Sequence, residues 1–204
     1  MKLNLLLATV AAAGMLVAAN ANAATPIWEF SSASASFTNG SWDFGNNFSV
    51  SSTVEVVALG YYNDPTTGVS GNPVALYDSN GNLLASATVN AGDPQVGHFL
   101  YASITPVLLA PGEYQIDGVS NTSNYTWNDS GFHTASPITY LGNTWQPGTT
   151  PDFQNSVQND VSDGYWGPNA LMAPEPSTWA MMGLGFAGLA FAGCRTRRTA
   201  TAIA

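Results

Sequence analysis

Short runs of alternating apolar and polar residues cover residues 25–173, with turn-forming residues between them. This alternation is typical of strands that bury one face, and no stretch in this region keeps a helical period over about three turns. Val54–Tyr62 is the strongest run, because it is rich in β-branched and aromatic side chains. Such runs recur about every ten residues, so the pattern predicts an all-β fold, an antiparallel β-sandwich or jelly roll of about eight or nine strands.

The middle of the chain shows the clearest hairpin. Val74–Tyr77 and Leu83–Val89 are strand-like, and Asp78–Asn82 between them contains Asn80-Gly81, which favours a tight turn with positive φ values. The second run should separate apolar side chains from hydroxyls, with Leu83, Ala85, Ala87 and Val89 on one face and Ser86 and Thr88 on the other. Asp78–Asn82 also looks like the start of an EF-hand loop, but its glycine stands in the wrong position, so the turn interpretation is preferred.

Four further runs fit strands. Residues 34–37 and 42–44 alternate, and Asn39-Gly40 predicts a hairpin-type turn between them. Residues 98–104 and 113–119 follow the same period. In the last run the polar residues alternate with the apolar ones, with Glu113, Gln115 and Asp117 opposite Tyr114 and Ile116.

The first residues have the features of a signal peptide. Met1-Lys2 supplies a basic start, residues 3–19 are mostly apolar or small, and Ala21-Asn22-Ala23 matches an A-x-A cleavage site. We expect cleavage after Ala23, with cleavage after Ala21 as the alternative. Residues 1–23 are then the signal peptide, and residues 24–172 form one domain that is long enough to bury a core.

Residues 173–204 combine three elements in a fixed order. Pro174, Glu175 and Pro176 form a stiff tripeptide, because proline fixes φ and disfavours helix in the residue before it. Residues 178–194 are uncharged and mostly apolar, at the short end of what spans a bilayer. A cluster of arginines follows, which consists of Arg195, Arg197 and Arg198. This order is typical of a stop-transfer transmembrane helix whose arginines stay on the cytoplasmic side.

This tail resembles the PEP-CTERM sorting signal, which consists of a Pro-Glu-Pro motif, a membrane helix and a basic end. The resemblance implies an exported protein of a Gram-negative bacterium, anchored transiently in the inner membrane and processed near Pro174-Glu175-Pro176 by an exosortase. It also implies a cell that makes exopolysaccharide for a biofilm, and a final location in the envelope, at the surface or in the matrix. The same tail is also described as an ice-binding protein C-terminal domain, a label that carries no activity. An ordinary C-terminal anchor is the alternative.

Residues 54–127 resemble exported bacterial β-sandwich modules of unknown function. The similarity is carried by A-L-G-Y-Y at 58–62, by the hairpin sequence at 74–89 and by L-A-P-G-E-Y-Q-I at 109–116. Residues 138–140 and 164–169 resemble the end of the domain in the same group of PEP-CTERM proteins. The resemblance implies a fold and leaves the activity open.

Charge is distributed very unevenly along the chain. The four basic residues all lie in the targeting segments, as Lys2, Arg195, Arg197 and Arg198. Of the thirteen carboxylates, all but Glu175 lie between Glu29 and Asp163, so residues 24–173 carry twelve acidic residues and neither Lys nor Arg. This region cannot neutralise phosphates, which excludes nucleic acid as a partner. It would attract divalent cations, and simple solubility in an extracellular matrix is the competing explanation of its charge.

Catalytic and metal-binding chemistry is sparse in this sequence. His98 and His133 are the only histidines, and no G-x-S-x-G surrounds a serine, so we predict no enzyme. Cys194 is the single cysteine, which disfavours zinc, and no cofactor is predicted. Oxygen-rich loops at Asn128-Asp129 and Asn159-Asp160 leave a structural calcium ion open. Two carboxylates brought together by the fold would be the route to a glycoside-active enzyme.

Residues 125–169 place aromatic rings beside amides and carboxylates. Sugar-binding sites have this composition, because rings stack on the apolar faces of sugars while amides and carboxylates bind the hydroxyls. The candidate sugar-binding residues are Trp127, Trp145 and Trp166, and the alternative is that these rings cap the hydrophobic core. Our leading hypothesis is therefore a non-enzymatic structural protein of the envelope or exopolysaccharide matrix. A carbohydrate-binding module ranks second, and a glycoside-active enzyme ranks third.

Overall fold

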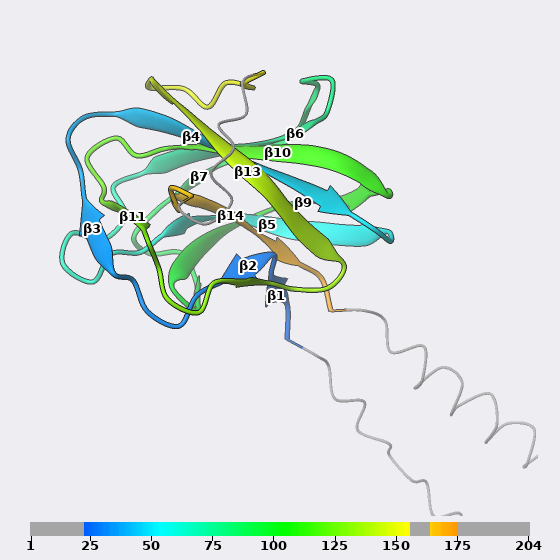
Figure 1. Cartoon of the computed structure of the whole chain (residues 1–204), viewed down its shortest axis with the longest axis horizontal. Coiled ribbons are helices and arrows are strands. Elements are labelled where there is room, and N and C mark those ends of the chain that lie inside the picture. The colour runs from blue at the N-terminus through cyan, green and yellow to red at the C-terminus, as the bar shows by residue number, and fades with distance from the viewer. Residues whose placement is uncertain (1–22, 156–163, 175–204) are drawn as a thin grey trace, which may run out of the picture. The chain divides into compact units, whose positions relative to one another are not determined.

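Antiparallel strands form the regular structure of this chain in the computed structural model, which describes residues 23–155 and 164–174 (Figure 1). These residues contain fourteen strands and no helix. The short strands are β1 (Thr25–Pro26), β2 (Trp28–Glu29), β3 (Ala35–Phe37), β8 (Gln95–Val96), β11 (Tyr125–Trp127) and β12 (His133–Thr134). The longer strands are β4 (Trp42–Val50), β5 (Val54–Tyr62), β6 (Asn72–Asp78), β7 (Leu83–Val89), β9 (Phe99–Leu109), β10 (Gly112–Val119), β13 (Ile138–Pro147) and β14 (Pro168–Met172).

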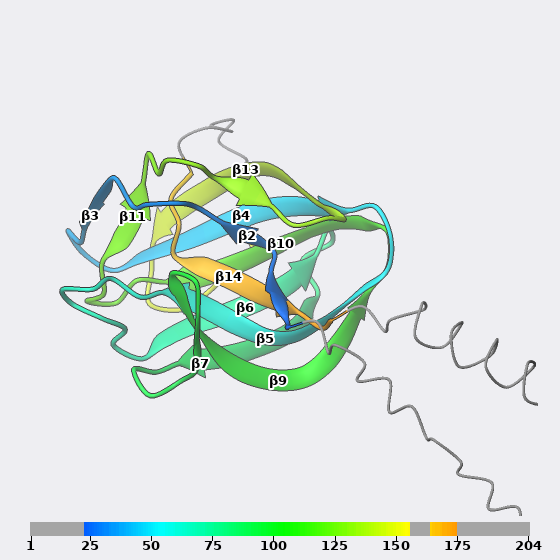
Figure 2. The ribbon, with the colours of Figure 1, turned by 90° about the horizontal axis from the view of Figure 1, so that it is seen from below.

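One five-stranded sheet has the order β1-β14-β5-β9-β8. β5 pairs with β9 from Val54 opposite Leu109 to Tyr62 opposite Phe99. On its other side β5 pairs with β14, which in turn pairs with β1, so the first and the last described strands lie side by side in this sheet (Figure 2). The two ends of the described chain, β1 and β14, therefore pair with each other although they are more than a hundred residues apart in sequence.

A second five-stranded sheet has the order β13-β4-β10-β6-β7. β4 lies between β13 and β10, and its Gly45 is opposite Thr144 on one side and Asp117 on the other. Residues opposite one another in neighbouring strands point to the same face. Gly45, Thr144 and Asp117 therefore share one face of this sheet, while Phe48 and Ile116 point to the hydrophobic core on the opposite face.

Both sheets contribute side chains to one hydrophobic core. Its largest fully buried members are Trp28, Trp166, Tyr61, Tyr62, Phe30, Phe48 and Phe99. The rings contact one another at angles, as between Trp28 and Phe48 with centroids 6.0 Å apart and between Trp28 and Trp166 at 5.8 Å. Burying each such side chain stabilises the fold by roughly 1.5–3 kcal/mol, so these rings hold the chain together without any disulfide.

Several strand predictions are confirmed. The run Val54–Tyr62 has the same bounds as β5, and Leu83–Val89 has the same bounds as β7. The β6–β7 hairpin also forms, with Gly81 at φ 80° and with the Asp78 carboxylate accepting the backbone N–H groups of Asn80 and Asn82. Only the glycine of the Asn80-Gly81 pair has positive φ, so the expectation of positive φ at both residues was wrong.

The predicted hairpin at Asn39-Gly40 is wrong. β3 pairs with β11, and β4 pairs with β10 and β13, so the strands on the two sides of this turn belong to different sheets. The Asn39 side chain instead accepts a hydrogen bond from Nε1 of Trp42 at 2.7 Å. This bond and the partners of β3 further along the chain determine the path of the segment, and neither is visible in the local alternation.

Two side-chain faces also differ from the prediction. A register shift places Leu83 opposite Tyr77 and leaves Leu84 as the extra residue, so Leu83 is 57% exposed and Leu84 packs against the core. In β10 the polar residues alternate with the apolar ones as expected, yet Gln115 and Asp117 are buried. The physical reason is a covering segment, residues 148–155, which lies over the outer face of the second sheet.

Some predictions fall on residues outside the described part of the chain. These are the signal peptide up to Asn22, the oxygen-rich loop at Asn159-Asp160, the segment 178–194, the arginine cluster, Cys194, and Glu175 and Pro176 of the sorting motif. Within residues 23–155 and 164–174, no helix is long and apolar enough to cross a membrane. The described residues belong to one compact unit that spans Ala23–Glu175.

Candidate functional site

Aromatic side chains gather where β3 pairs with β11. The rings of Phe37 and Trp127 contact each other with centroids 4.7 Å apart, and Tyr125 contacts both. Beneath them, Phe44 of β4 and Tyr165 contact Tyr125 at 4.4 Å and 5.6 Å. Phe37 is 39% exposed and Trp127 is half-buried, so this ring cluster reaches the surface.

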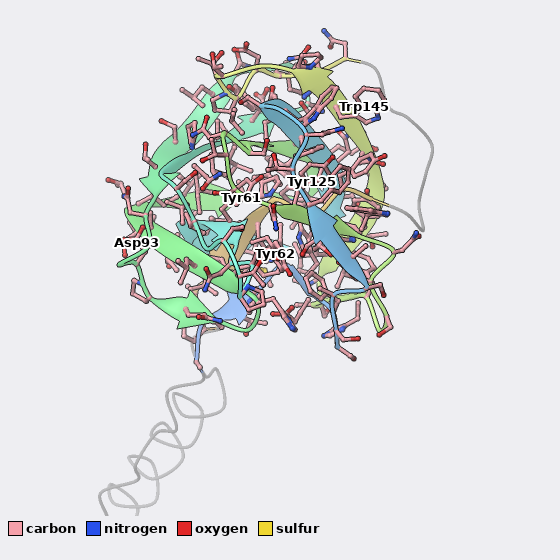
Figure 3. The ribbon with its side chains drawn as sticks, turned by 90° about the vertical axis from the view of Figure 1, so that its left-hand side faces the viewer. Tyr61, Tyr62, Asp93, Tyr125 and Trp145 are labelled. Carbon is pink, nitrogen blue, oxygen red and sulfur yellow. The ribbon has the colours of Figure 1, made fainter. Side chains whose placement is uncertain are left out.

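A second aromatic pair, Trp42 and Trp145, lies on neighbouring strands β4 and β13. Their ring centroids are 5.3 Å apart in an edge-to-face arrangement, and Trp145 is 38% exposed. Figure 3 shows Trp145 at the edge of the fold and Tyr125 nearer its centre. Oδ1 of Asn39 accepts hydrogen bonds from Trp42 Nε1 and, at 3.3 Å, from the Tyr125 hydroxyl. One amide therefore connects the two groups of rings.

A surface depression of about 450 Å³ lies beside Trp42, one member of this aromatic pair. Its walls consist of Thr38, Gly40, Ser41, Asn121, Thr122 and Thr149. A Cβ atom placed on Gly40 would lie 3.9 Å from Nε1 of Trp42, which puts the depression next to the indole. The lining offers hydroxyls, an amide and backbone groups but no charge, which is the chemistry that binds neutral polar ligands.

The three tryptophans predicted to bind sugar have different environments. Trp145 is exposed at the edge of the second sheet, and Trp127 is half-buried in the first ring cluster. Trp166 is 1% exposed and stacks on Phe132 with centroids 4.3 Å apart. A ring without an exposed face cannot stack on a sugar at the surface. The prediction for Trp166 is therefore corrected, since this residue belongs to the core.

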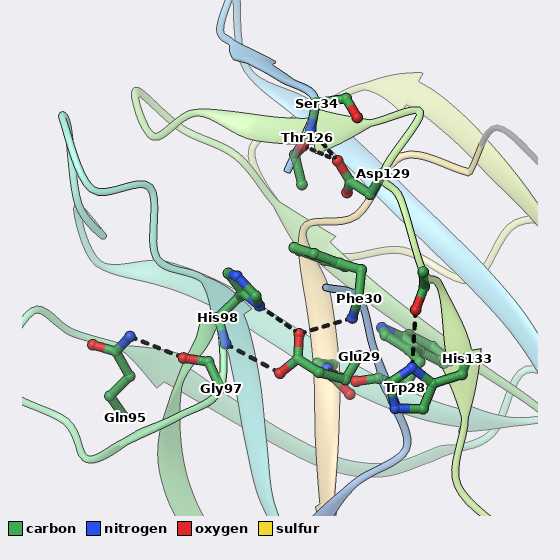
Figure 4. Close-up of polar contacts among 12 residues, drawn as sticks. Trp28, Glu29, Phe30, Ser34, Gln95, Gly97, His98, Thr126, Asp129 and His133 are labelled. Carbon is green, nitrogen blue, oxygen red and sulfur yellow. Dashed lines mark hydrogen bonds and ion pairs between the residues drawn. The ribbon is translucent and has the colours of Figure 1, made fainter. Parts of the chain in front are cut away.

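The His98 side chain contacts both Glu29 and Phe30 of the N-terminal segment (Figure 4). Its Nδ1 lies 2.7 Å from Oε1 of Glu29, and its imidazole stacks on Phe30 at 4.5 Å. Glu29 also accepts the backbone N–H of Phe30 at 3.0 Å and that of His98 at 3.1 Å. These contacts attach the N-terminal strand β2 to the segment between β8 and β9, which is a structural role.

His133 is exposed and contacts the carbonyl of Gly131 at 3.0 Å. It lines a depression of about 280 Å³ together with Glu29 and small neighbours. Among the described residues, no group of three or more His, Cys, Asp or Glu side chains could hold a metal ion. Neither histidine therefore belongs to a metal cluster in this part of the chain.

Two buried carboxylates, Asp43 and Asp117, lie on the outer face of the second sheet. Burial raises the pKa of Asp43 to about 6, against hydrogen bonds from Asp152, Gln146 and Gln154 that lower it. Burial and the neighbouring Asp43 charge raise the pKa of Asp117 well above its usual range. Sequence reasoning missed this pair, because nothing local shows that Gln154 will lie over β4 and β10.

A third buried carboxylate, Asp64, behaves in the opposite way. Burial tends to raise its pKa, but donors from Ser36, Thr66 and Thr67 outweigh that effect and hold the pKa far below its ordinary value. Ser36 donates its hydroxyl to Oδ2 at 2.5 Å, and Thr66 and Thr67 donate backbone N–H groups to Oδ1 at 2.8 Å and 3.0 Å. The side chain closes the turn that follows β5.

Comparison with known proteins adds one finding about the C-terminal part of the sequence. Residues 173–198 match the model of the PEP-CTERM protein-sorting motif. No curated protein matches this chain. The motif implies export, transient anchoring in a membrane and processing by an exosortase. The chain thus combines a β-rich domain with a PEP-CTERM sorting motif, as an exported protein targeted to an exosortase.

Proposed function

We propose that this chain is a non-enzymatic protein of the cell envelope or exopolysaccharide matrix, and that its β-rich domain binds neutral polysaccharide. In this proposal the two five-stranded sheets form a β-sandwich or jelly roll, and the protein acts at the cell surface or in the matrix of a biofilm-forming Gram-negative cell. A signal peptide at residues 1–23 and a transmembrane helix at 178–194 direct it there.

The observation that carries the proposal is the uncharged depression beside Trp42, whose ring contacts the partly exposed ring of Trp145. An exposed indole offers an apolar face for the C–H groups of a sugar ring. The hydroxyls of Thr38, Ser41 and Thr149 line the depression and can exchange hydrogen bonds with sugar hydroxyls. Residues 24–173 contain no Lys or Arg, so the ligand this surface suits is neutral rather than anionic.

The position of the buried carboxylates supports a role without catalysis. Glycoside hydrolysis needs two carboxyl groups that flank an accessible glycosidic bond. Asp43 and Asp117 are both 0% exposed, and Gln154 donates from above to both of them. A polysaccharide chain cannot approach them in this arrangement, which favours binding over hydrolysis.

Affinity electrophoresis tests the proposal. The full chain, recovered in the form its host exports, is run through gels that contain neutral polysaccharide from the same host. We expect retardation, and we expect Trp145→Ala to weaken binding by about tenfold, which corresponds to about 1.4 kcal/mol of lost ring contact. Leu108→Ala is the matched control, because Leu108 is 70% exposed on β9 and should bind as the native chain does.

Two outcomes would reject carbohydrate binding at this site. One is a native chain that migrates as freely in polysaccharide gels as in plain gels. The other is equal retardation of the native chain and Trp145→Ala. The location is tested separately by the intact mass in each cell fraction, where the proposal requires loss of the residues before Ala24 and of those after about Pro176.

A further inference from the structure

The outer face of the second sheet carries a group of buried oxygen atoms around Gly45. Asp117 and Thr144 are opposite Gly45 on the two neighbouring strands. A Cβ atom on Gly45 would lie 2.5 Å from Oδ1 of Asp117 and 2.4 Å from Oγ1 of Thr144. The Asp117 carboxylate and the Thr144 hydroxyl therefore approach Gly45 from the two neighbouring strands. They occupy space that the side chain of any larger residue at position 45 would fill.

Asp43 belongs to the same group. Nε2 of Gln154 lies 3.3 Å from Oδ2 of Asp43 and 3.4 Å from Oδ1 of Asp117, so the two carboxylates face one amide. Oδ2 of Asp43 also accepts the backbone N–H of Asp152 at 2.9 Å and Nε2 of Gln146 at 3.3 Å. One carboxylate oxygen of each residue is thus used to hold the covering segment.

The remaining oxygens of this group have no partner among the described residues. Oδ1 of Asp43, Oδ2 of Asp117 and Oγ1 of Thr144 are buried and make no hydrogen bond. All three residues are 0% exposed. Buried polar atoms of native proteins are nearly always paired, and one that lacks a protein partner indicates a bound ion or water. Three such atoms on one face of the sheet point to a shared ligand.

The negative charges of Asp43 and Asp117 must be compensated, either by a bound cation or by protonation of the carboxylates. Leaving a buried carboxylate ionised without a compensating charge costs several kcal/mol. No Lys or Arg occurs between residues 3 and 194, so no side chain of this domain can supply a fixed positive charge. The ion pair found among the described residues joins His98 to Glu29, away from the second sheet.

We propose that Asp43, Asp117 and Thr144 bind a calcium ion on the outer face of the second sheet, beneath residues 148–155. Carboxylate and hydroxyl oxygens are hard ligands, and calcium accepts six to eight of them in flexible geometry, with water completing the shell. The cover then depends on the ion, because the same two carboxylates bind the metal and hold Asp152 and Gln154. This proposal does not depend on carbohydrate binding.

Equilibrium dialysis with radioactive calcium tests the site in the full chain at pH 7.5. We expect one ion per native chain, and loss of that ion in the double variant D43N/D117N. Asp78→Asn is the control, because it makes the same kind of change, one Asp to Asn, in the exposed turn that looks like a calcium loop, and it should keep the ion. Calcium at about 100-fold above its Kd should also raise the Tm by roughly 5–10 °C.

Three results would overturn the proposal. The first is that the native chain binds no calcium at millimolar concentration, which would mean that protons neutralise the two carboxylates. The second is that the double variant keeps the ion. The third is that Asp78→Asn loses the ion. If the double variant fails to fold, Thr144→Val decides, since it removes one neutral ligand and leaves both carboxylates. We expect that variant to bind calcium about tenfold more weakly, and unchanged affinity would contradict the site.

Discussion

Asp64 and the pair formed by Asp43 and Asp117 all expose almost no surface to solvent, yet their environments are opposite. Asp64 is 2% exposed and accepts hydrogen bonds from three hydroxyls and two backbone N–H groups. The pair is 0% exposed, and each of its members has one oxygen without a partner among residues 23–155 and 164–174. The pKa of Asp64 is lowered, whereas the pKa values of Asp43 and Asp117 are raised.

The difference shows that burial alone does not determine the state of a carboxylate. Desolvation raises the pKa at all three residues, and the number of donors decides which sign the net shift takes. A turn such as Asp64–Thr67 brings several donors to one oxygen within four residues of chain. A flat sheet face cannot do so, because its backbone N–H groups are already used in pairing with neighbouring strands.

The largest effect should come from removing the better-paired carboxylate. Asp64→Ala leaves the backbone N–H groups of Thr66 and Thr67 without their acceptor, so we expect the free energy of unfolding to fall by about 4 kcal/mol. Urea denaturation of the full chain measures this loss. Glu113→Ala, an exposed carboxylate on β10, should change stability by less than about 0.5 kcal/mol. Equal effects of the two variants would mean that the Asp64 contacts are not stabilising.

The pH dependence of stability should separate the two environments in calcium-free protein. Because the pKa of Asp43 is raised to about 6, the folded state binds its proton more tightly than the unfolded state, and stability should fall by about 2–3 kcal/mol between pH 4 and pH 6. Asp64 has a lowered pKa, so its contribution is present above about pH 4 and is lost at lower pH. Urea midpoints measured from pH 2 to pH 8 should therefore peak near pH 4–5, and a curve that rises up to pH 7 would contradict this.

A smaller effect, of opposite sign to that at Asp64, is expected at Asp117. Asp117→Asn removes a buried carboxyl that has no positive charge beside it among the described residues, so in EDTA at pH 7.5 we expect stabilisation by about 1–2 kcal/mol. At pH 4 the native carboxyl is protonated and the variant should equal the native chain. In calcium the sign should reverse, because the native chain then gains a ligand that the variant lacks. If Asp117→Asn instead destabilises the calcium-free protein at pH 7.5, the Asp117 carboxyl is already stabilised by its surroundings, which would contradict this prediction.

Features of the fold that depend only on contacts between residues close in the sequence could be predicted from the sequence. The bounds of β5 and β7 follow from alternation and β-branched residues, and the sorting motif at residues 173–198 follows from its Pro-Glu-Pro sequence and basic end. The turn at Asp78–Asn82 is equally local. These features need contacts only between neighbours in the chain, so the residue pattern is sufficient for them.

The candidate sites required information that the pattern does not contain. Gln115 and Asp117 alternate like exposed residues, and only the path of residues 148–155 across β4 and β10 buries them. Trp166 has Gly, Asn and Pro near it in sequence, as Trp145 has, but it lies beside Phe132 in the core. The depression beside Trp42 joins residues 38–41 to residues 121, 122 and 149. Such groupings are set by sheet order, which one sequence leaves undetermined.

The most direct test of the account is an NMR titration of the side-chain carboxyl carbons, first in EDTA and then in calcium. In EDTA we expect Asp43 to titrate near pH 6, Asp117 above the usual aspartate range and Asp64 well below it. Calcium should then lower the pKa values of Asp43 and Asp117 and leave Asp64 unchanged, because only the pair binds the ion. Three carboxyls that all titrate near pH 4 with and without calcium would contradict both the contrast and the calcium site.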